Sequence, residues 1–343
     1  MRNVKLVTGG SGFLGMHMAR ALIDRGDRVR ILDVEEPEKG IMERTEFIKS
    51  DIRDFDAVIR ACKGVDAVYH AASVVPISKA GKEFYEINAG GTRNLLEAAL
   101  QNKVSKVIHI SSSSVYGDPK KGEVIDEDFR ISPVGKYGKS KWEAEKLCFE
   151  YMKKGLTITI IRPRTVLGPG RLGIFSVLFD WVRRGRKIYI IGNGDNIFSF
   201  VSARDLVDAC IKAEERCGNH IFNIGNEDRT VIRDDLEFLI KHANSDSRIF
   251  PLNAKASKFI LKLLDKTGIS PVTEFHYTAA DKEYVFDVSR AKKMLGWEPR
   301  DSNRKMLMDT YDWYLHNRRN LREGKKHRFL QNQGILKLLG LFS

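Results

Sequence analysis

The sequence contains few cysteines and no long uncharged apolar run. Its four cysteines, Cys62, Cys148, Cys210 and Cys217, show no Cys-x-x-Cys spacing, and the eight histidines are dispersed. This pattern predicts neither a disulfide framework nor a metal site, and it favours a reducing cytoplasm. No run of about 18 uncharged apolar residues is present, and the N-terminal residues lead directly into a predicted strand. We therefore expect no membrane-spanning helix and no signal peptide.

The composition is that of a folded protein of about two domains with an excess of positive charge. Of its 343 residues 42% are hydrophobic, which excludes a disordered or collagen-like chain. Lys and Arg number 58 against 45 Asp and Glu, so the formal net charge is +13. This excess favours anionic ligands or surfaces. The positive residues follow no known nucleic-acid-binding module, so we expect no nucleic-acid partner.

Short apolar runs alternate with amphipathic segments through the first half of the chain. The predicted strands cover residues 4–8, 29–33, 47–48, 65–72, 104–111 and 157–162, and the predicted helices cover residues 13–25, 91–101 and 139–153. Several strand runs are apolar throughout, as strands are when helices cover both faces of a parallel sheet. The alternation predicts an α/β fold with a doubly wound parallel sheet.

A glycine-rich segment separates the first strand from the first helix. It places Gly9, Gly12 and Gly15 where a dinucleotide pyrophosphate binds in a βαβ unit. Glycines permit the tight turn and the close approach of the ligand, and the helix N-terminus attracts its negative charge. The alternative is a plain strand-to-helix turn, which the βαβ context disfavours.

Asp33 ends the second predicted strand. A carboxylate there accepts hydrogen bonds from the adenosine ribose hydroxyls and repels a 2′-phosphate. The next residues, Val34, Glu35 and Glu36, include no arginine that would neutralise such a phosphate. The pattern predicts NAD rather than NADP, with a simple turn residue as the alternative.

Tyr137 and Lys141 stand four residues apart, which places them on the same face of a helix. A nearby ammonium stabilises tyrosinate and lowers the pKa of the phenol, so Tyr137 is a candidate general base for a substrate hydroxyl. The same spacing is common by chance on exposed helices. The pair therefore indicates a catalytic site only in combination with the other motifs of the chain.

Together these motifs resemble those of the extended short-chain dehydrogenase/reductase family, also called the NAD-dependent epimerase/dehydratase family. They occur in the family's order: the three glycines, Asp33, Asp51-Ile52, His70-Ala71-Ala72-Ser73, Asn88 in NAGGT, the SSSSVYG run from Ser111 to Gly117, and YGKSK. The match covers about residues 1–300. It implies a Rossmann sheet, NAD at its switch point and a smaller C-terminal substrate-binding lobe. It also implies a homodimer that pairs helices at about residues 85–101 and 137–153.

The resemblance implies individual roles as well. Tyr137 is similar to the family's catalytic base, Lys141 to its ribose-holding lysine and Ser112 to its substrate-orienting hydroxyl. The expected cofactor-binding residues are Gly9, Gly12, Phe13, Leu14, Gly15, Asp33, Asp51, Ile52, Ala71, Ala72, Ser73, Asn88, Tyr137, Lys141 and Pro163. The expected substrate-binding residues are Ser113, Thr165, Arg171 and Arg204. For Ser113 a hydroxyl-rich strand end without chemistry is an equal alternative, and His70 is interpreted as a core histidine.

The composition changes after about residue 164, where turn-forming Gly and Arg become frequent. We expect residues 1–164 to form the NAD-binding domain, completed by parts of the C-terminal half, and residues 165–317 to form the substrate-binding lobe. Within that lobe Ser289 is a candidate N-cap for a short helix over residues 290–295, which Gly296 ends.

Two pairs of positions bear on the reaction. Family dehydratases carry Asp-Glu directly after the catalytic Ser or Thr, where this chain has Ser113 and Ser114, so dehydration is not expected. The family's nucleotide-sugar enzymes carry an Asn and an Arg near the diphosphate, where this chain has Thr165 and Phe198. Arginines that could replace that charge are Arg164, Arg171, Arg183, Arg184 and Arg204. We expect a nucleotide-sugar 4-epimerase; the alternative is a 3β-hydroxysteroid-type dehydrogenase or ketone reductase with net turnover of NAD.

The last segment, residues 318–343, is basic and then apolar. It holds seven Lys and Arg and one Glu, so it contributes 7 − 1 = +6 to the net charge. Its apolar part is too short to span a bilayer but long enough to lie at an anionic membrane surface. We therefore consider peripheral contact with the inner face of the membrane, with docking on the protein itself as the alternative.

Overall fold

The computed structural model describes residues 4–76, 80–171, 173–266 and 274–323. Its larger part is a seven-stranded parallel sheet in the order β11-β7-β5-β4-β1-β2-β3. The strands are β1 (Val4–Thr8), β2 (Arg28–Asp33), β3 (Glu46–Lys49), β4 (Ala67–His70), β5 (Lys106–Ile110), β7 (Ile158–Pro163) and β11 (His220–Ile224). The order reverses between β1 and β4, and ligands of doubly wound sheets bind beyond the carboxyl ends of the strands at this point.

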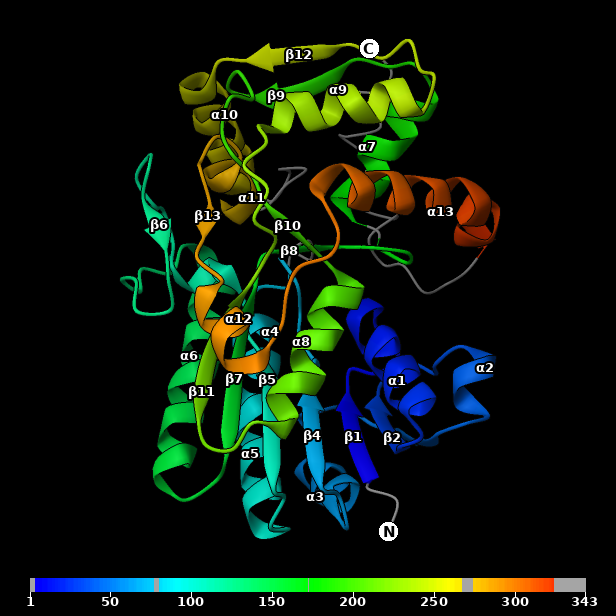
Figure 1. Cartoon of the computed structure of the whole chain (residues 1–343), viewed down its shortest axis with the longest axis vertical. Coiled ribbons are helices and arrows are strands. Elements are labelled where there is room, and N and C mark those ends of the chain that lie inside the picture. Colours follow the sequence, from blue (N-terminus) through cyan, green and yellow to red (C-terminus); the bar gives the residue numbers. More distant parts are fainter. Residues whose placement is uncertain (1–3, 77–79, 172, 267–273, 324–343) are drawn as a thin grey trace.

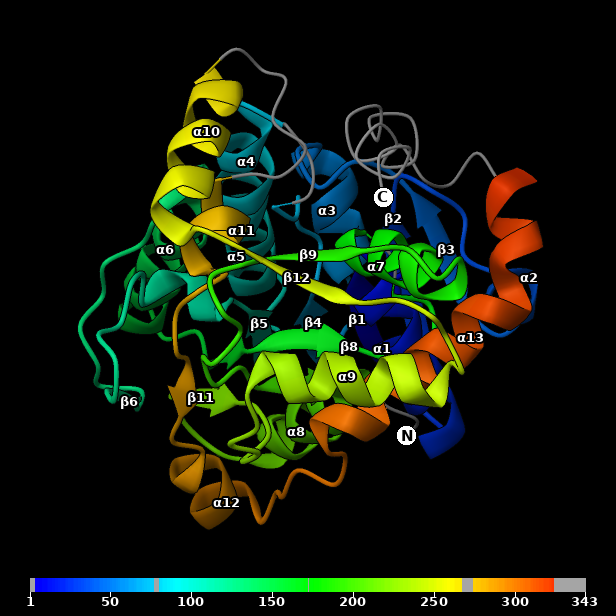
Figure 2. The ribbon, with the colours of Figure 1, turned by 90° about the horizontal axis from the view of Figure 1, so that it is seen from above.

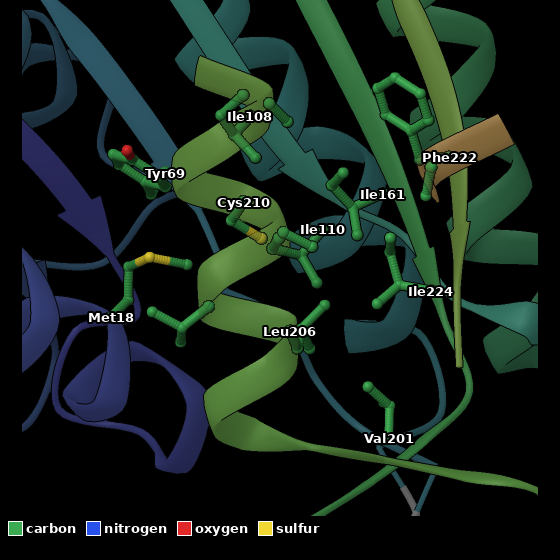
Figure 3. Packing of buried hydrophobic residues seen from close by; sticks show 14 of the residues in the cluster. Met18, Tyr69, Ile108, Ile110, Ile161, Val201, Leu206, Cys210, Phe222 and Ile224 are labelled. Atoms are coloured by element: carbon green, nitrogen blue, oxygen red, sulfur yellow. The ribbon is translucent and has the colours of Figure 1, made fainter. Parts of the chain in front are cut away.

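Helices cover both faces of the sheet because successive strand side chains point to opposite faces. On one face lie α1 (Phe13–Arg25), α8 (Ala203–Glu215) and α12 (Ser289–Leu295), and on the other lie α3 (Phe55–Cys62), α5 (Thr92–Gln101) and α6 (Gly135–Lys153). Figure 3 shows the first of these cores, in which Met18, Leu206 and Cys210 face the strand residues Ile108 and Ile161. The fold is thus the doubly wound Rossmann sheet that the sequence predicts.

A smaller lobe lies beyond the carboxyl ends of the strands (Figures 1 and 2). Its parallel strand pairs are β8 (Thr165–Leu167) with β10 (Phe200–Ser202), β9 (Ile188–Ile191) with β12 (Ile249–Leu252), and β6 (Val124–Ile125) with β13 (Val285–Phe286). Its helices are α7 (Ile174–Arg183), α9 (Ile232–His242), α10 (Ala254–Lys266), α11 (Glu274–Ala279) and α13 (Asn303–Glu323). Helix α13 contacts both α7 and α9 and closes the core of the lobe.

Short helices join the larger elements. They are α2 (Lys39–Met42), α4 (Glu83–Tyr85), a π-helix (Glu86–Gly91) that leads into α5, and a 3-10 turn (Ser113–Val115) directly after β5. No helix within the described ranges is both long and apolar enough to cross a membrane.

The element boundaries differ from the sequence predictions at several ends. Helix α1 has the predicted bounds, whereas β4 and β5 are shorter than the apolar runs that predicted them, and α6 begins at Gly135, before Tyr137. Ser289 is not the N-cap of α12 but its first residue, and Val288 occupies the cap position. The Asp287 carboxylate accepts the hydrogen bond from the backbone N–H of Ser289 at 2.7 Å, so the acidic residue two positions earlier holds the start of the helix.

Candidate active site

The glycine-rich loop between β1 and α1 leaves no room for side chains. Gly9 has φ of +70°, and a Cβ there would lie 2.6 Å from the backbone nitrogen of Ala72. A Cβ on Gly15 would lie 2.0 Å from the Gly9 carbonyl oxygen. No side chain caps α1 at Gly12, so the first N–H groups of the helix are available to an anion. The loop therefore fits the pyrophosphate of a dinucleotide.

The Asp33 carboxylate lies directly against this loop. It accepts hydrogen bonds from the backbone N–H groups of Ser11, at 2.9 Å, and Glu35, at 3.1 Å. Burial raises the pKa of Asp33, while these N–H donors oppose the rise. The structure thus places a positioned carboxylate at the carboxyl end of β2, where the sequence predicts a ribose contact.

The predicted adenine-contacting residues follow β3. The Asp51 carboxylate pairs with the Arg53 guanidinium at 2.7 Å, and this hydrogen bond lowers the pKa of Asp51. Ile52 is buried, and a Cβ on Gly91 would lie 2.5 Å from its side chain. The backbone of the π-helix therefore packs closely on Ile52. Ile52 belongs to the hydrophobic core between the sheet and α5.

Asn88 ties the loop after β4 to the helix that carries Tyr137. Its side-chain oxygen accepts from the Val74 N–H at 2.8 Å and from the Ser73 hydroxyl at 3.0 Å, and its amide nitrogen donates to the Ser140 hydroxyl at 3.0 Å. Ser140 in turn donates to the backbone oxygen of Tyr137 at 2.8 Å. Asn88 is buried, so this network fixes α6 relative to the cofactor edge of the sheet.

Ser112, Tyr137 and Lys141 meet at the carboxyl end of β5. Ser112 and the Tyr137 hydroxyl are hydrogen-bonded to one another; burial raises the pKa of Tyr137, whereas this bond lowers it. The buried ammonium of Lys141 donates to the backbone oxygen of Ile110 at 2.7 Å, and burial lowers the pKa of Lys141 to about 8. The three residues that the sequence predicts as catalytic are therefore brought to one place.

Arg171 is the charged group that acts on Tyr137. Its positive charge lowers the pKa of the Tyr137 hydroxyl, and its guanidinium lies 5.5 Å from the centre of the Phe13 ring. The loop that carries Arg171 is held on α1, because the His17 ring is hydrogen-bonded to the Pro169 backbone oxygen at 2.8 Å. Sequence reasoning predicts that Lys141 lowers this pKa; Ser112 and Arg171, which the structure adds, lower it as well.

The structure gives three of the other predicted arginines carboxylate partners. Arg183 and Arg184 both pair with Asp180 at 2.8 Å. Arg204 pairs with Asp301 at 2.8 Å, and 62% of its side chain is exposed. The charge of these residues is balanced within the protein. The ion pairs of Arg183 and Arg184 lie within α7 and its C-cap, whereas that of Arg204 joins α8 to the segment before α13.

Arg164 differs from all of these. It follows Pro163 at the carboxyl end of β7, is 3% exposed, and its Nη1 donates to the Ser113 hydroxyl at 3.1 Å. Its Nε and Nη2 are buried and have no hydrogen-bond partner among the described residues. The rings that surround the guanidinium belong to Phe198, Tyr284 and Phe286, with centres 4.8, 4.4 and 5.5 Å from its carbon. Sequence reasoning did not predict this aromatic cage, because its members come from distant segments.

His70 is a satisfied core histidine, as the sequence predicts. Its ring nitrogens are hydrogen-bonded to the hydroxyls of Thr8 at 2.7 Å and Thr92 at 2.9 Å. Burial lowers the pKa of His70 to about 3, so the ring is neutral. Within the described part of the chain, no group of three or more metal-ligating side chains is present.

Comparison with known proteins decides the family. The sequence model described as "NAD dependent epimerase/dehydratase family" matches residues 5–225, which is more than half of the chain. The chain belongs to the NAD-dependent epimerase/dehydratase family. The predictions of a Rossmann-fold, NAD-dependent enzyme are thereby confirmed.

Relatives within the family differ in their reactions. The uncharacterised protein y4nG of Sinorhizobium fredii is 38% identical over 97% of this chain and 85% of its own length. The mouse sterol-4-alpha-carboxylate 3-dehydrogenase (decarboxylating) is 28% identical over 85% of this chain and 86% of its own. Among solved structures, the Bacillus cereus UDP-glucuronic acid 4-epimerase in complex with NAD is 27% identical, with a TM-score of 0.76 over 91% of this chain and 99% of its own.

Proposed function

We propose that the protein is an NAD-dependent 4-epimerase that inverts a secondary alcohol of a nucleotide sugar. The observation that carries this proposal is the meeting of Ser112, Tyr137 and the Arg171 charge beside the glycine loop. Ser112 orients the substrate hydroxyl, and the Tyr137 oxygen takes its proton and later returns it. Bound NAD would supply the hydride acceptor for the carbinol carbon and the hydride that is returned to the opposite face.

The remaining residues of the site support this chemistry. Lys141, held by the Ile110 oxygen, is positioned to bind the cofactor ribose, as the resemblance implies. Ser114 lies where family dehydratases have an acidic residue, and its hydroxyl is buried without a partner among the described residues. Elimination of water needs an additional acid and base, so the absence of a carboxyl group at this position favours epimerisation over dehydration.

The relatives also support a nucleotide-sugar substrate. The 27%-identical solved structure is a UDP-glucuronic acid 4-epimerase, and a Methanocaldococcus jannaschii relative named as a putative UDP-glucose 4-epimerase is 32% identical over 69% of this chain. The test is incubation of NAD-loaded protein with UDP-hexoses and UDP-hexuronates of either configuration at C4. We expect ¹H NMR to show conversion to the C4 epimer without accumulation of NADH.

A second candidate is net oxidation of an apolar secondary alcohol. The aromatic residue Phe198, at a position where the family's nucleotide-sugar enzymes carry Arg, favours it, as does the mouse sterol relative. A dehydrogenase releases one NADH for each substrate oxidised, whereas an epimerase regenerates NAD. Stoichiometric absorbance at 340 nm would therefore contradict the epimerase and favour this candidate.

We further propose that the protein is a homodimer in the cytoplasm. Helices α5 and α6, which the resemblance implies at the interface, contact one another on one face of the sheet. A two-fold symmetric contact of this kind is the commonest arrangement of homo-oligomers. Light scattering at micromolar concentration should give twice the mass of the chain, and a monomer would contradict the proposal.

We also propose that the protein contacts a membrane surface. The segment predicted to make this contact is the tail, residues 318–343, of which residues 324–343 lie outside those that the structure describes. The described residues add a surface of their own on α10, where Phe259, Ile260 and Leu263 are 64, 54 and 48% exposed beside the exposed Lys255 and Lys262. Exposed apolar side chains flanked by lysines suit a surface of anionic headgroups.

A further inference from the structure

The guanidinium of Arg164 is a buried charge, and two of its nitrogens have no hydrogen-bond partner among the described residues. It is 3% exposed and forms no ion pair among the described residues, whereas Arg162, two residues earlier on β7, is 2% exposed and pairs with the Glu145 carboxylate at 2.6 Å. Burial lowers the pKa of Arg164 to about 10, so the group is charged at neutral pH. A buried charge without a counterion destabilises a fold, and such a feature suggests a ligand that balances it.

The unused hydrogen-bond donors of Arg164 define the shape of that ligand. Nη1 is held by the Ser113 hydroxyl at 3.1 Å, while Nε and Nη2 have no partner within the described ranges. The N–H groups of Nε and Nη2 point in parallel from one edge of the planar guanidinium. That edge binds two oxygens of one anion, as in Arg–carboxylate pairs.

The position of Arg164 relates this edge to the reacting atoms. Ser113 follows Ser112 directly, and consecutive Cα atoms are about 3.8 Å apart. Ser112 is hydrogen-bonded to Tyr137, and Ser113 holds Arg164. Arg164 is therefore joined, through Ser113, to the residue next to the one that is hydrogen-bonded to Tyr137.

We propose that the Nε and Nη2 edge of Arg164 binds a carboxylate that the substrate carries on the carbon next to the oxidised carbinol. The substrate is then a sugar acid of the hexuronate class rather than a neutral hexose. This inference rests on the proposed function for the nucleotide part of the substrate. The carboxylate contact itself rests on Arg164 and Ser113.

The cage also indicates how the ligand reaches the guanidinium. The Tyr284 hydroxyl donates to the Gly117 backbone oxygen at 2.6 Å, and Phe286 belongs to β13 and is buried. Phe198 is partly exposed and precedes β10. Phe198 is therefore the least buried of the three rings, and we expect the carboxylate to enter on its side of the cage.

Calorimetric titration of NAD-loaded protein with UDP-glucuronate, UDP-glucose and UDP tests the proposal. We expect UDP-glucuronate to bind about 10²-fold more tightly than UDP-glucose. Arg164→Met should remove this preference and leave the affinities for UDP-glucose and UDP unchanged. Arg164→Lys should keep part of the preference, because it keeps the charge and loses the parallel donors. The matched control is Arg130→Met, since Arg130 also covers an aromatic ring, Phe129, but lies at the surface and pairs with Glu123.

Stability separates this role from a structural one. Because Arg164→Met removes an unbalanced buried charge, we expect the ligand-free variant to unfold at an equal or higher temperature than the parent. A lower unfolding temperature together with an unchanged ligand preference would show a structural role and overturn the proposal.

The relative affinities for the three ligands show which part of the proposal fails. Equal binding of UDP-glucuronate and UDP-glucose by the parent overturns the carboxylate site while leaving the nucleotide-sugar function standing. Equal loss of all three ligands in Arg164→Met would place a phosphate on Arg164 and also overturn it. Binding of none of the three overturns the nucleotide-sugar function and this inference with it.

Discussion

The positive charge of Arg171 acts on the hydroxyl of Tyr137 from the opposite lobe of the molecule. Arg171 belongs to the loop after β8, and Tyr137 belongs to α6 on the Rossmann sheet. The two residues define the part of the site where the lobe reaches the proposed catalytic base.

Replacement of Arg171 should change the pH dependence of the reaction. Burial raises the pKa of Tyr137, and the Arg171 charge opposes that rise. In Arg171→Met the pKa of Tyr137 rises further, so the basic form is populated only at higher pH. We expect the acidic limb of the kcat/KM profile to move to higher pH. An unchanged profile with a raised KM alone would show that Arg171 only binds substrate.

Replacement of Tyr137 tests the catalytic base. Tyr137→Phe keeps the ring, which packs edge-on against Phe84 with centres 6.2 Å apart, and removes the oxygen. We expect turnover to fall by about 10²–10⁴-fold while NAD still binds. Tyr189→Phe on β9 is the matched control and should retain activity. Near-parental activity of Tyr137→Phe would exclude the proposed mechanism.

Replacement of Asp33 tests the cofactor preference. Asp33→Ala removes the carboxylate that accepts the hydrogen bond of the Ser11 N–H in the glycine loop. The repulsion of a 2′-phosphate is lost with it. We expect the preference for NAD over NADP to narrow by about tenfold or more, measured as the ratio of dissociation constants. Asp24→Ala, at an exposed residue of α1, should leave the ratio unchanged. Tighter binding of NADP by the parent would show that Asp33 does not make the selection.

The buried histidines should make the protein sensitive to acid. Burial lowers the pKa of His70 to about 3 and that of His109 well below its usual range. Below about pH 6.5 the unfolded chain binds protons that the folded chain does not. Above pH 6.5 neither histidine changes the stability with pH, whereas on acidification each lowers the free energy of unfolding by up to about 1.4 kcal/mol per pH unit.

His109→Phe isolates one of these contributions. Both ring nitrogens of His109 lack partners among the described residues, so the substitution removes no hydrogen bond. Urea unfolding at pH 5 and pH 7 should show a smaller loss of stability on acidification in this variant. His242→Asn, at a partly exposed residue beside Asp312, should behave like the parent. Equal losses in all three proteins would contradict the prediction.

Membrane contact can be separated into tail and helix contributions. A chain that ends at Asn317 lacks the predicted tail, and a variant with Phe259→Ser, Ile260→Ser and Leu263→Ser lacks the apolar surface of α10. We expect each change to reduce sedimentation with anionic liposomes by about tenfold, because stable peripheral binding combines two weak signals. Neutral liposomes are the control. Equal sedimentation of all forms would remove both surfaces from the proposal.

Local sequence determined much of the fold and part of the site. The bounds of α1 follow from its apolar spacing between Gly12 and Gly26, which adopts the left-handed conformation that ends the helix. The glycine loop, Asp33 and the pair Tyr137 and Lys141 are short-range patterns, because each depends on neighbours in one strand or one helical turn. Ends set by tertiary contacts were less predictable, as the short β4 and the Asp287-held start of α12 show.

Only the tertiary structure decided the surroundings of Arg164 and Arg204. In the sequence Arg164, Arg171, Arg183, Arg184 and Arg204 are equivalent candidates for an anion site. Folding pairs Arg204 with Asp301 and brings both Arg183 and Arg184 to Asp180, while it encloses Arg164 among three rings without a carboxylate. The physical reason is that the energy of an ion depends on its distance from counterions and water. For Arg183 and Arg184 the counterion is three or four residues away in one helix, a spacing that the sequence contains. For Arg164 and Arg204 these distances are set by residues far apart in the chain, which no local pattern specifies.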